Sequence, residues 1–181
     1  MDSYAVAFQT YFGKAGLQRG IELCLEHKCY LSALTLIYTA IDNLAFLDVP
    51  ESQQRVTGQD FIKWTDKYLS PERSLGCTAS DLYSARCAIV HTLTTESNKV
   101  REKTAHRLFY AWGTTPVIPK TGIDDLWPNE AIVMIKIEDL AQVLFRGMGQ
   151  FWLDIVSNKE AYSRVFARLK KVLATVPFEQ K

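Results

Sequence analysis

Residues 31–47, LSALTLIYTAIDNLAFL, decide the fold that we expect for this chain of 181 residues. In a helical conformation this stretch carries apolar side chains almost all the way round, which is typical of a helix buried on most sides. Asp42 is the only charged residue that it contains. The stretch therefore predicts the central helix of a helical bundle.

Apolar residues also recur at helical spacing on both sides of this stretch. Glycines at 13, 16 and 20 weaken a continuous helix, so the N-terminal segment predicts one long or two short helices. We expect Ser80 to be the N-cap of the helix that follows it, because serine is a preferred N-cap residue. The next residue, Asp81, is an acid, which the helix dipole favours near a helix N-terminus. A capping sequence, SNKE, opens the last helix. The segments with helical spacing are 4–28, 59–69, 81–93, 140–156 and 157–172.

Two short runs interrupt the helical pattern. The runs RLFYAW at 107–112 and AIVMIKI at 131–137 are rich in β-branched and aromatic residues, and prolines and glycines punctuate the stretch between them. They predict a β-hairpin with a long connection, which we expect to cover a cleft or a partner surface. The chain is therefore expected to be a single mainly α-helical domain, residues 1–181, with a small β-hairpin insertion.

The charges of the chain nearly cancel. It has 21 Lys and Arg against 20 Asp and Glu, a formal net charge of +1. This balance excludes the broad basic surface of a protein that coats nucleic acid nonspecifically. Any contact with RNA or DNA is therefore expected to be local.

Cysteine spacing argues against a metal site. The four cysteines form no C-x-x-C pair, and no second ligand pair completes the group Cys24, His27 and Cys29. We expect no metal and a reduced, cytoplasmic setting. The chain opens with Met-Asp-Ser-Tyr rather than a basic segment, and no apolar run approaches the ~18 residues of a membrane span, so neither export nor a membrane partner is expected.

One motif that could carry chemistry remains after the common ones are sought. The sequence has no G-x-S-x-G, Walker loop, G-x-G-x-x-G or H-E-x-x-H pattern. Arg86 and His91 lie on the helix predicted for 81–93, and their separation turns them by about 140° about its axis. We therefore expect them not to meet within one chain, so that a two-fold dimer would bring two such pairs together.

The side chains of arginine and histidine have the chemical groups that cleavage of RNA without a metal requires. Histidine near neutral pH can take or give a proton, and the forked guanidinium of arginine matches phosphate oxygens. One pair supplies half of the required groups, and a symmetric partner would supply the other half. The product expected from attack by the 2′-hydroxyl is a 2′,3′-cyclic phosphate.

The segment 82–93, LYSARCAIVHTL, resembles the motif helix of the HEPN (higher eukaryotes and prokaryotes nucleotide-binding) superfamily, in which an Arg and a His lie on one helix. Many members look like metal-independent ribonucleases that act as homodimers. The resemblance implies an up-and-down helical bundle, catalytic roles for Arg86 and His91, RNA as substrate and no cofactor. For a toxin or defence protein it also implies an antitoxin or other partner protein. Arg101 and His106 repeat the spacing without apolar periodicity, and we discount them.

Four further residues are candidates for supporting roles. Asp42 would pair with Arg86, because a buried acid needs a cation or several donors. Tyr83 and Cys87 share a helix face, as do Cys87 and His91, and Thr92 directly follows the histidine. The same contacts fit a purely structural interpretation, in which the arginine serves the buried acid and the histidine is hydrogen-bonded near the helix end.

Two other functions stay open. Active HEPN members often have a polar residue after the motif arginine, where this chain has Cys87. This difference favours a non-catalytic, dimerising module that binds a partner protein or a nucleotide. The tryptophans at 64, 112, 127 and 152 would fit a carrier that holds a small molecule in an apolar cavity.

Overall fold

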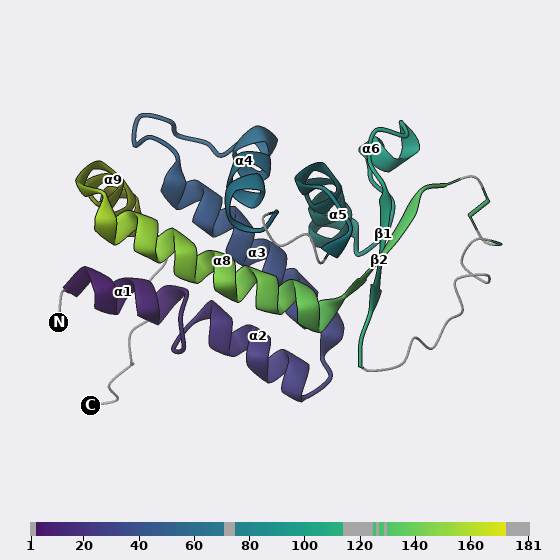
Figure 1. Ribbon diagram of the computed structural model, residues 1–181, viewed down its shortest axis with the longest axis horizontal. Coiled ribbons are helices and arrows are strands. Elements are labelled where there is room, and N and C mark those ends of the chain that lie inside the picture. Colours follow the sequence, from purple (N-terminus) through teal and green to yellow (C-terminus); the bar gives the residue numbers. More distant parts are fainter. Residues whose placement is uncertain (1–2, 71–74, 114–124, 126, 129, 173–181) are drawn as a thin grey trace, which may run out of the picture.

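The computed structural model describes residues 3–70, 75–113, 125, 127, 128 and 130–172, and of residues 3 and 4 only the backbone. Most of the described residues are helical (Figure 1). The helices are α1 (Ser3–Tyr11), α2 (Leu17–Glu26), α3 (Tyr30–Asp48), α4 (Gly58–Tyr68), α5 (Ala79–Thr92), α6 (Asn98–Arg101), α8 (Ile137–Ser157) and α9 (Lys159–Leu169), and the strands are β1 (Arg107–Ala111) and β2 (Ile132–Lys136). The expected mainly α-helical class with a small β element is confirmed.

The helix α3 lies at the centre of this arrangement, as the apolar stretch 31–47 predicted. It contacts α2, α4, α5, α8 and α9. Side chains on several of its sides, among them Ile37, Tyr38, Ile41 and Leu44, are completely buried. Neighbours on most sides explain why the sequence of α3 lacks a polar face.

In the described residues α3 is also the one helix that is long and apolar enough to cross a membrane. This corrects the expectation that no apolar run approaches that length. Half of the most apolar 18-residue stretch of α3 is buried against the rest of the protein, as in the core helix of a folded domain. Its composition is therefore accounted for by packing.

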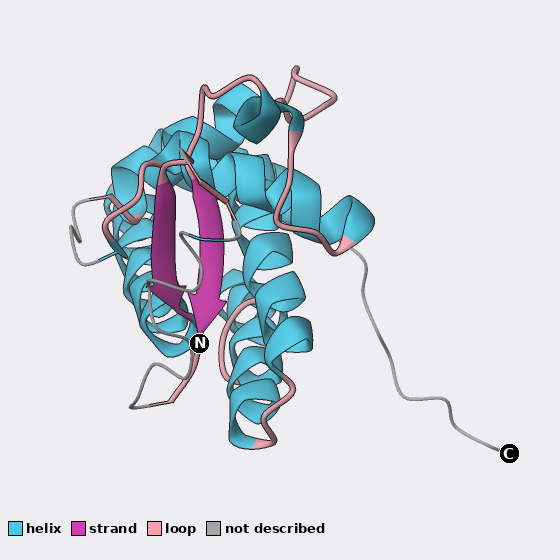
Figure 2. Cartoon of the chain, turned by 90° about the vertical axis from the view of Figure 1, so that its right-hand side faces the viewer, coloured by secondary structure: helices cyan, strands magenta, loops and turns pink. Residues whose placement is uncertain are grey.

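The two strands pair in parallel, which corrects the expected β-hairpin. Arg107 lies opposite Ile132 and Ala111 opposite Lys136, and Figure 2 shows the strands side by side. A hairpin closes with a few residues, whereas a parallel pair needs a connection of a dozen or more, which the stretch between β1 and β2 provides. Residues 114–124, 126 and 129 of that connection lie outside the described residues, and so does its expected role as a cover.

The boundaries of the terminal helices differ in detail from those expected. The N-terminal segment forms two helices, and a Cβ at Gly16 would lie 2.2 Å from the carbonyl oxygen of Tyr11, so the tight turn between them requires glycine. The cap of α9 is Asn158 rather than Ser157, because the Asn158 side chain accepts hydrogen bonds from the next backbone N–H groups. The short helix α6 was not predicted.

Candidate functional site

The helix α5 carries the candidate pair, and its start is fixed by a capping box. The backbone N–H of Thr78 donates to Asp81 Oδ2 at 2.8 Å, and the Thr78 hydroxyl accepts from the Asp81 N–H at 3.2 Å. Thr78 is therefore the N-cap, and the expected cap, Ser80, lies within the first turn. The helix ends at Leu93, whose φ of 53° is left-handed, so His91 lies in its last turn.

Arg86 pairs with Asp42 across the contact between α5 and α3, as predicted from the isolated acid. The Arg86 Nε donates to Asp42 Oδ2 at 2.7 Å, and their side chains are 23% and 27% exposed. Burial raises the pKa of the Asp42 carboxyl, while Arg86 and, more weakly, His91 oppose the rise. Burial also disfavours the charge of Arg86, but the hydrogen bond and charge of Asp42, together with Cys87, outweigh it and raise the pKa of the guanidinium.

His91 contacts Arg86 within the same chain. The Arg86 Nη1 lies 3.2 Å from His91 Nε2, which corrects the expectation that the two side chains do not meet. The turn of about 140° describes where the Cβ atoms point, whereas the long arginine side chain can bend back along the helix surface. Because a guanidinium only donates, Nε2 must accept in this contact, and a neutral imidazole carries its proton on Nδ1.

Asp42, Arg86 and His91 therefore form a row of side chains from the half-buried carboxylate to the surface. Asp42 fixes the Nε edge of the guanidinium and leaves the Nη edge directed at the imidazole. His91 itself is exposed. A positioned cation beside an imidazole provides one group that can transfer a proton and one that can stabilise a phosphate.

A groove of about 560 Å³ opens beside this row. One wall is a face of α5 with Tyr83, Cys87 and His91, and the other is formed by the loop after α5 and by α6. Arg86 is not among the residues that line the groove, but it contacts His91, which does line it. The predicted face of Tyr83, Cys87 and His91 is thus brought together, and it faces a cavity large enough for part of a substrate.

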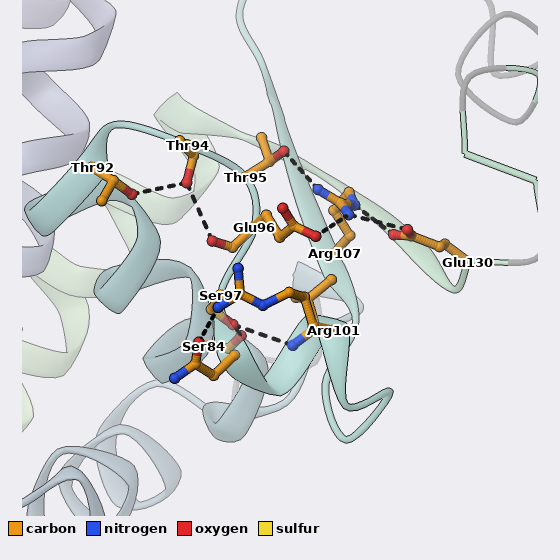
Figure 3. Close-up of polar contacts among 11 residues, drawn as sticks. Ser84, Thr92, Thr94, Thr95, Glu96, Ser97, Arg101, Arg107 and Glu130 are labelled. Atoms are coloured by element: carbon orange, nitrogen blue, oxygen red, sulfur yellow. Dashed lines mark hydrogen bonds and ion pairs between the residues drawn. The ribbon is translucent and has the colours of Figure 1, made fainter.

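The remaining supporting candidates have local roles. The Thr92 hydroxyl donates to the Ala88 carbonyl at 2.8 Å and lies 2.9 Å from the Thr94 hydroxyl, so it closes the helix end and the loop (Figure 3). Burial, together with the neighbouring Cys87, raises the pKa of Tyr83. Cys87 also hydrogen-bonds to the Arg86 guanidinium, and the charge of Arg86 acts in turn on Tyr83, whereas the bonds of Thr92 close the helix end.

The discounted pair Arg101 and His106 does not repeat the site. His106 bonds to Asp81 twice, from its backbone N–H at 2.7 Å and its Nδ1 at 2.9 Å, and so ties the start of β1 to the start of α5. Burial works against ionisation of Asp81, but the bonds from Thr78 and His106 lower its pKa. Arg101 instead bonds to Asn98 in α6.

Two groove residues, Lys99 and Arg101, were not predicted as functional: Lys99 was missed, and Arg101 was considered only in the discounted pair with His106. Both line the groove opposite His91. The sequence held a signal for them, because residues 99–103 (KVREK) concentrate cations directly after the motif helix. Sequence reasoning overlooked it because the net charge of the whole chain is small.

The other two sites considered from the sequence were a metal site near Cys24 and a cavity lined by tryptophans. No group of three possible metal ligands occurs within the described residues, and Cys24 and Cys29 are free. The tryptophans do not share a cavity: Trp64 and Trp152 pack in or against the core, Trp112 stacks on Tyr30, and Trp127 lies against Phe109. Comparisons with protein-family models, curated proteins and solved structures found no match to the chain.

Proposed function

We propose that the chain is a metal-independent endoribonuclease of the HEPN-like, toxin or defence type, acting as a homodimer. The observation that carries the proposal is the 3.2 Å contact between Arg86 and His91, made by an arginine that Asp42 holds in place at the edge of a groove. Phosphate is the ligand that a fixed guanidinium beside a groove fits best.

The reaction needs only groups that these residues have. His91 Nε2 takes the proton of a ribose 2′-hydroxyl, and the 2′-oxygen attacks the adjacent phosphorus. The bond from phosphorus to the 5′-oxygen breaks, which leaves a 2′,3′-cyclic phosphate, and the departing oxygen takes a proton from an acid. Arg86 releases His91, binds the phosphate oxygens and stabilises the charge that develops on them.

The acid is the reason for proposing a dimer. His91 is the only histidine among the residues that line the groove, so one chain offers a single imidazole there. The partner subunit's His91, placed by a two-fold axis on the other side of the phosphate, would supply the second. An antitoxin or other protein that covers the groove would then suppress the activity.

A second function is favoured by one feature of the same site. Asp42 already satisfies the charge of Arg86, and the next residue is the thiol Cys87 rather than a polar side chain. A groove of this kind would suit a non-catalytic module that binds a nucleotide or a partner protein. The two functions differ in whether His91 is needed for turnover.

Cleavage of RNA in the presence of EDTA tests the proposal. The parent protein, His91→Ala and the matched control His27→Ala would be incubated with structured and unstructured RNA. We expect the loss of His91 to reduce the rate by about 10²-fold or more, as for other general acid–base residues. His27 is exposed at the end of α2 and does not line the groove, so its removal should leave the rate unchanged. Equal cleavage by parent and His91→Ala would refute the proposal, and binding without cleavage would favour the non-catalytic module.

A further inference from the structure

The groove contains two cations whose charge no carboxylate neutralises within the described residues. Lys99 donates to the Ser80 hydroxyl at 3.1 Å, and Arg101 bonds to the Asn98 amide oxygen. Glu96 also lines the groove, and its carboxylate lies 3.8 Å from the Arg107 guanidinium. Uncompensated cations in a cavity favour an anionic ligand.

We infer that Lys99 and Arg101 bind the phosphates that flank the one at His91, so that the groove holds RNA by its backbone. The inference rests on the proposed function, because RNA is the anion that His91 would act on. It adds a binding track along α6 to the catalytic pair on α5. The two cations are two residues apart and line the same groove as His91.

The position of α6 is fixed relative to α5, which a binding track requires. The Ser97 hydroxyl caps α6 by accepting from the Val100 N–H, and it also lies 2.5 Å from the buried Ser84 hydroxyl of α5. Val100 is buried. Figure 3 shows Ser84 and Ser97 beside Arg101. The segment α6, which carries both cations, is therefore held against α5 before any ligand binds, which lowers the entropy cost of binding.

The groove offers no free aromatic face on which a base could stack. Tyr83 is the aromatic residue among those lining the groove. Its ring packs on Phe61 at 5.5 Å and so closely on Gly58 that a Cβ there would lie 2.3 Å from the ring. The Lys99 ammonium lies over the ring at 5.4 Å. Binding should therefore depend on phosphate charge and little on base identity.

The salt dependence of binding tests this inference. The probe is a short fluorescent single-stranded 2′-O-methyl RNA, which has no free 2′-hydroxyl and is not cut. Each phosphate contact to a single strand contributes about 0.7 to the slope of log affinity against log salt. Between about 50 and 200 mM salt, the double variant Lys99→Gln/Arg101→Gln should therefore lose about 1.4 of the slope.

The control removes the same charge elsewhere. Lys170 and Lys171 are exposed at the end of α9, at the opposite end of the molecule from α6 (Figure 1). Lys170→Gln/Lys171→Gln should keep the parent slope. Arg101→Gln alone, a change of one exposed side chain that leaves the α6 cap intact, should lose about 0.7 and guards against misfolding of the double variant.

The outcomes separate this inference from the proposed function. Equal slopes for the groove and control variants would overturn the phosphate track even if His91-dependent cleavage is found. A reduced slope in the groove variants would support the track even if no RNA is cut, because the probe cannot be cleaved. A hundredfold preference between oligo-U and oligo-A probes would overturn backbone recognition.

Discussion

At the scale of single residues, Arg86 joins the inside of the bundle to its surface. Its Nε bonds to the half-buried Asp42, and its Nη1 reaches the exposed His91. One side chain therefore stabilises the contact between α3 and α5 and also positions a cation beside the imidazole. Stability and function should for this reason respond together to changes at Asp42.

We expect Asp42→Asn to reduce the free energy of unfolding by about 1–3 kcal/mol, because the amide oxygen can still accept a hydrogen bond but no longer supplies the negative charge that offsets the burial of Arg86. Arg86→Met should have a similar cost. The double variant should cost less than the sum, with a coupling of about 0.5–3 kcal/mol, because either single change already breaks the pair. Urea denaturation measures all three, and strictly additive costs would show that the pair contributes no stability.

The two contacts of Arg86 differ in how far the sequence could predict them. The bond to Asp42 followed from a general requirement, because a lone acid in an apolar helix needs a cation. The contact with His91 depends on side-chain rotamers of a long, flexible residue, which helical spacing does not specify. Helical spacing fixes only the directions of the Cβ atoms, which point apart at these two positions.

At the scale of elements, the helix start and the strand pairing are fixed by polar contacts. Asp81 caps α5 and also holds the start of β1 through His106. The hydroxyl groups of Tyr38 and Tyr110 bond to each other and link α3 to β1. These contacts connect the small sheet to the helices that carry the candidate site.

We expect Asp81→Asn to lower the free energy of unfolding at pH 7 by about 1–2 kcal/mol, as the loss of a helix cap does. The folded pKa of Asp81 lies below its ordinary value of 3.8, so its stabilising effect is complete above that value and lost as the pH falls through the folded pKa. Unfolding measured from pH 7 to about pH 3 should show a shallower decline for the variant. Parallel curves would contradict this assignment.

The tyrosine pair allows a matched test of the link between α3 and β1. Tyr110→Phe leaves the hydroxyl of the fully buried Tyr38 without a partner among the described residues, at an expected cost of about 1–3 kcal/mol. Tyr38→Phe/Tyr110→Phe removes both polar groups and should be more stable than the sum of the single changes implies. Thermal unfolding of the three variants measures these losses of stability. A double variant that loses as much stability as the two single variants together would count against the link.

Helices were predicted better than strands because their signal is local. The apolar stripes of α3, α4, α8 and α9 repeat within a few residues, whereas strand direction depends on partners far apart in the chain. Short apolar runs such as RLFYA fit either a hairpin or a parallel pair. The length of the connection was the observation that favoured the parallel pair, since a hairpin needs only a few linking residues.

At the scale of the whole molecule, the positive and negative charges nearly balance, although positive side chains are grouped in one groove. The net charge is +1, yet Lys99 and Arg101 line one groove together with His91, and no carboxylate among the described residues pairs with either cation. Composition could therefore exclude a broad basic surface but could not place this local one. The grouping arises from the fold, which brings α6 against α5.

We expect the protein to sediment with twice the mass of one chain at micromolar concentration. The proposed acid and base come from two subunits, so cleavage should fall more steeply than protein concentration once dimers dissociate. Sedimentation velocity and rate measurements over the same dilution series provide the comparison. A monomer with full, concentration-proportional activity would remove the reason for proposing a dimer.

The central claim is that Arg86 and His91 cut RNA through its own 2′-hydroxyl, and analysis of the product ends tests it most directly. An RNA cut by the parent protein in EDTA would be compared with the same RNA carrying one 2′-deoxy nucleotide at the cleavage position. We expect a 2′,3′-cyclic phosphate from the first, no cut at the substituted position in the second, and neither product with His91→Ala. Cleavage that survives both the 2′-deoxy substitution and the loss of His91 would contradict the claim.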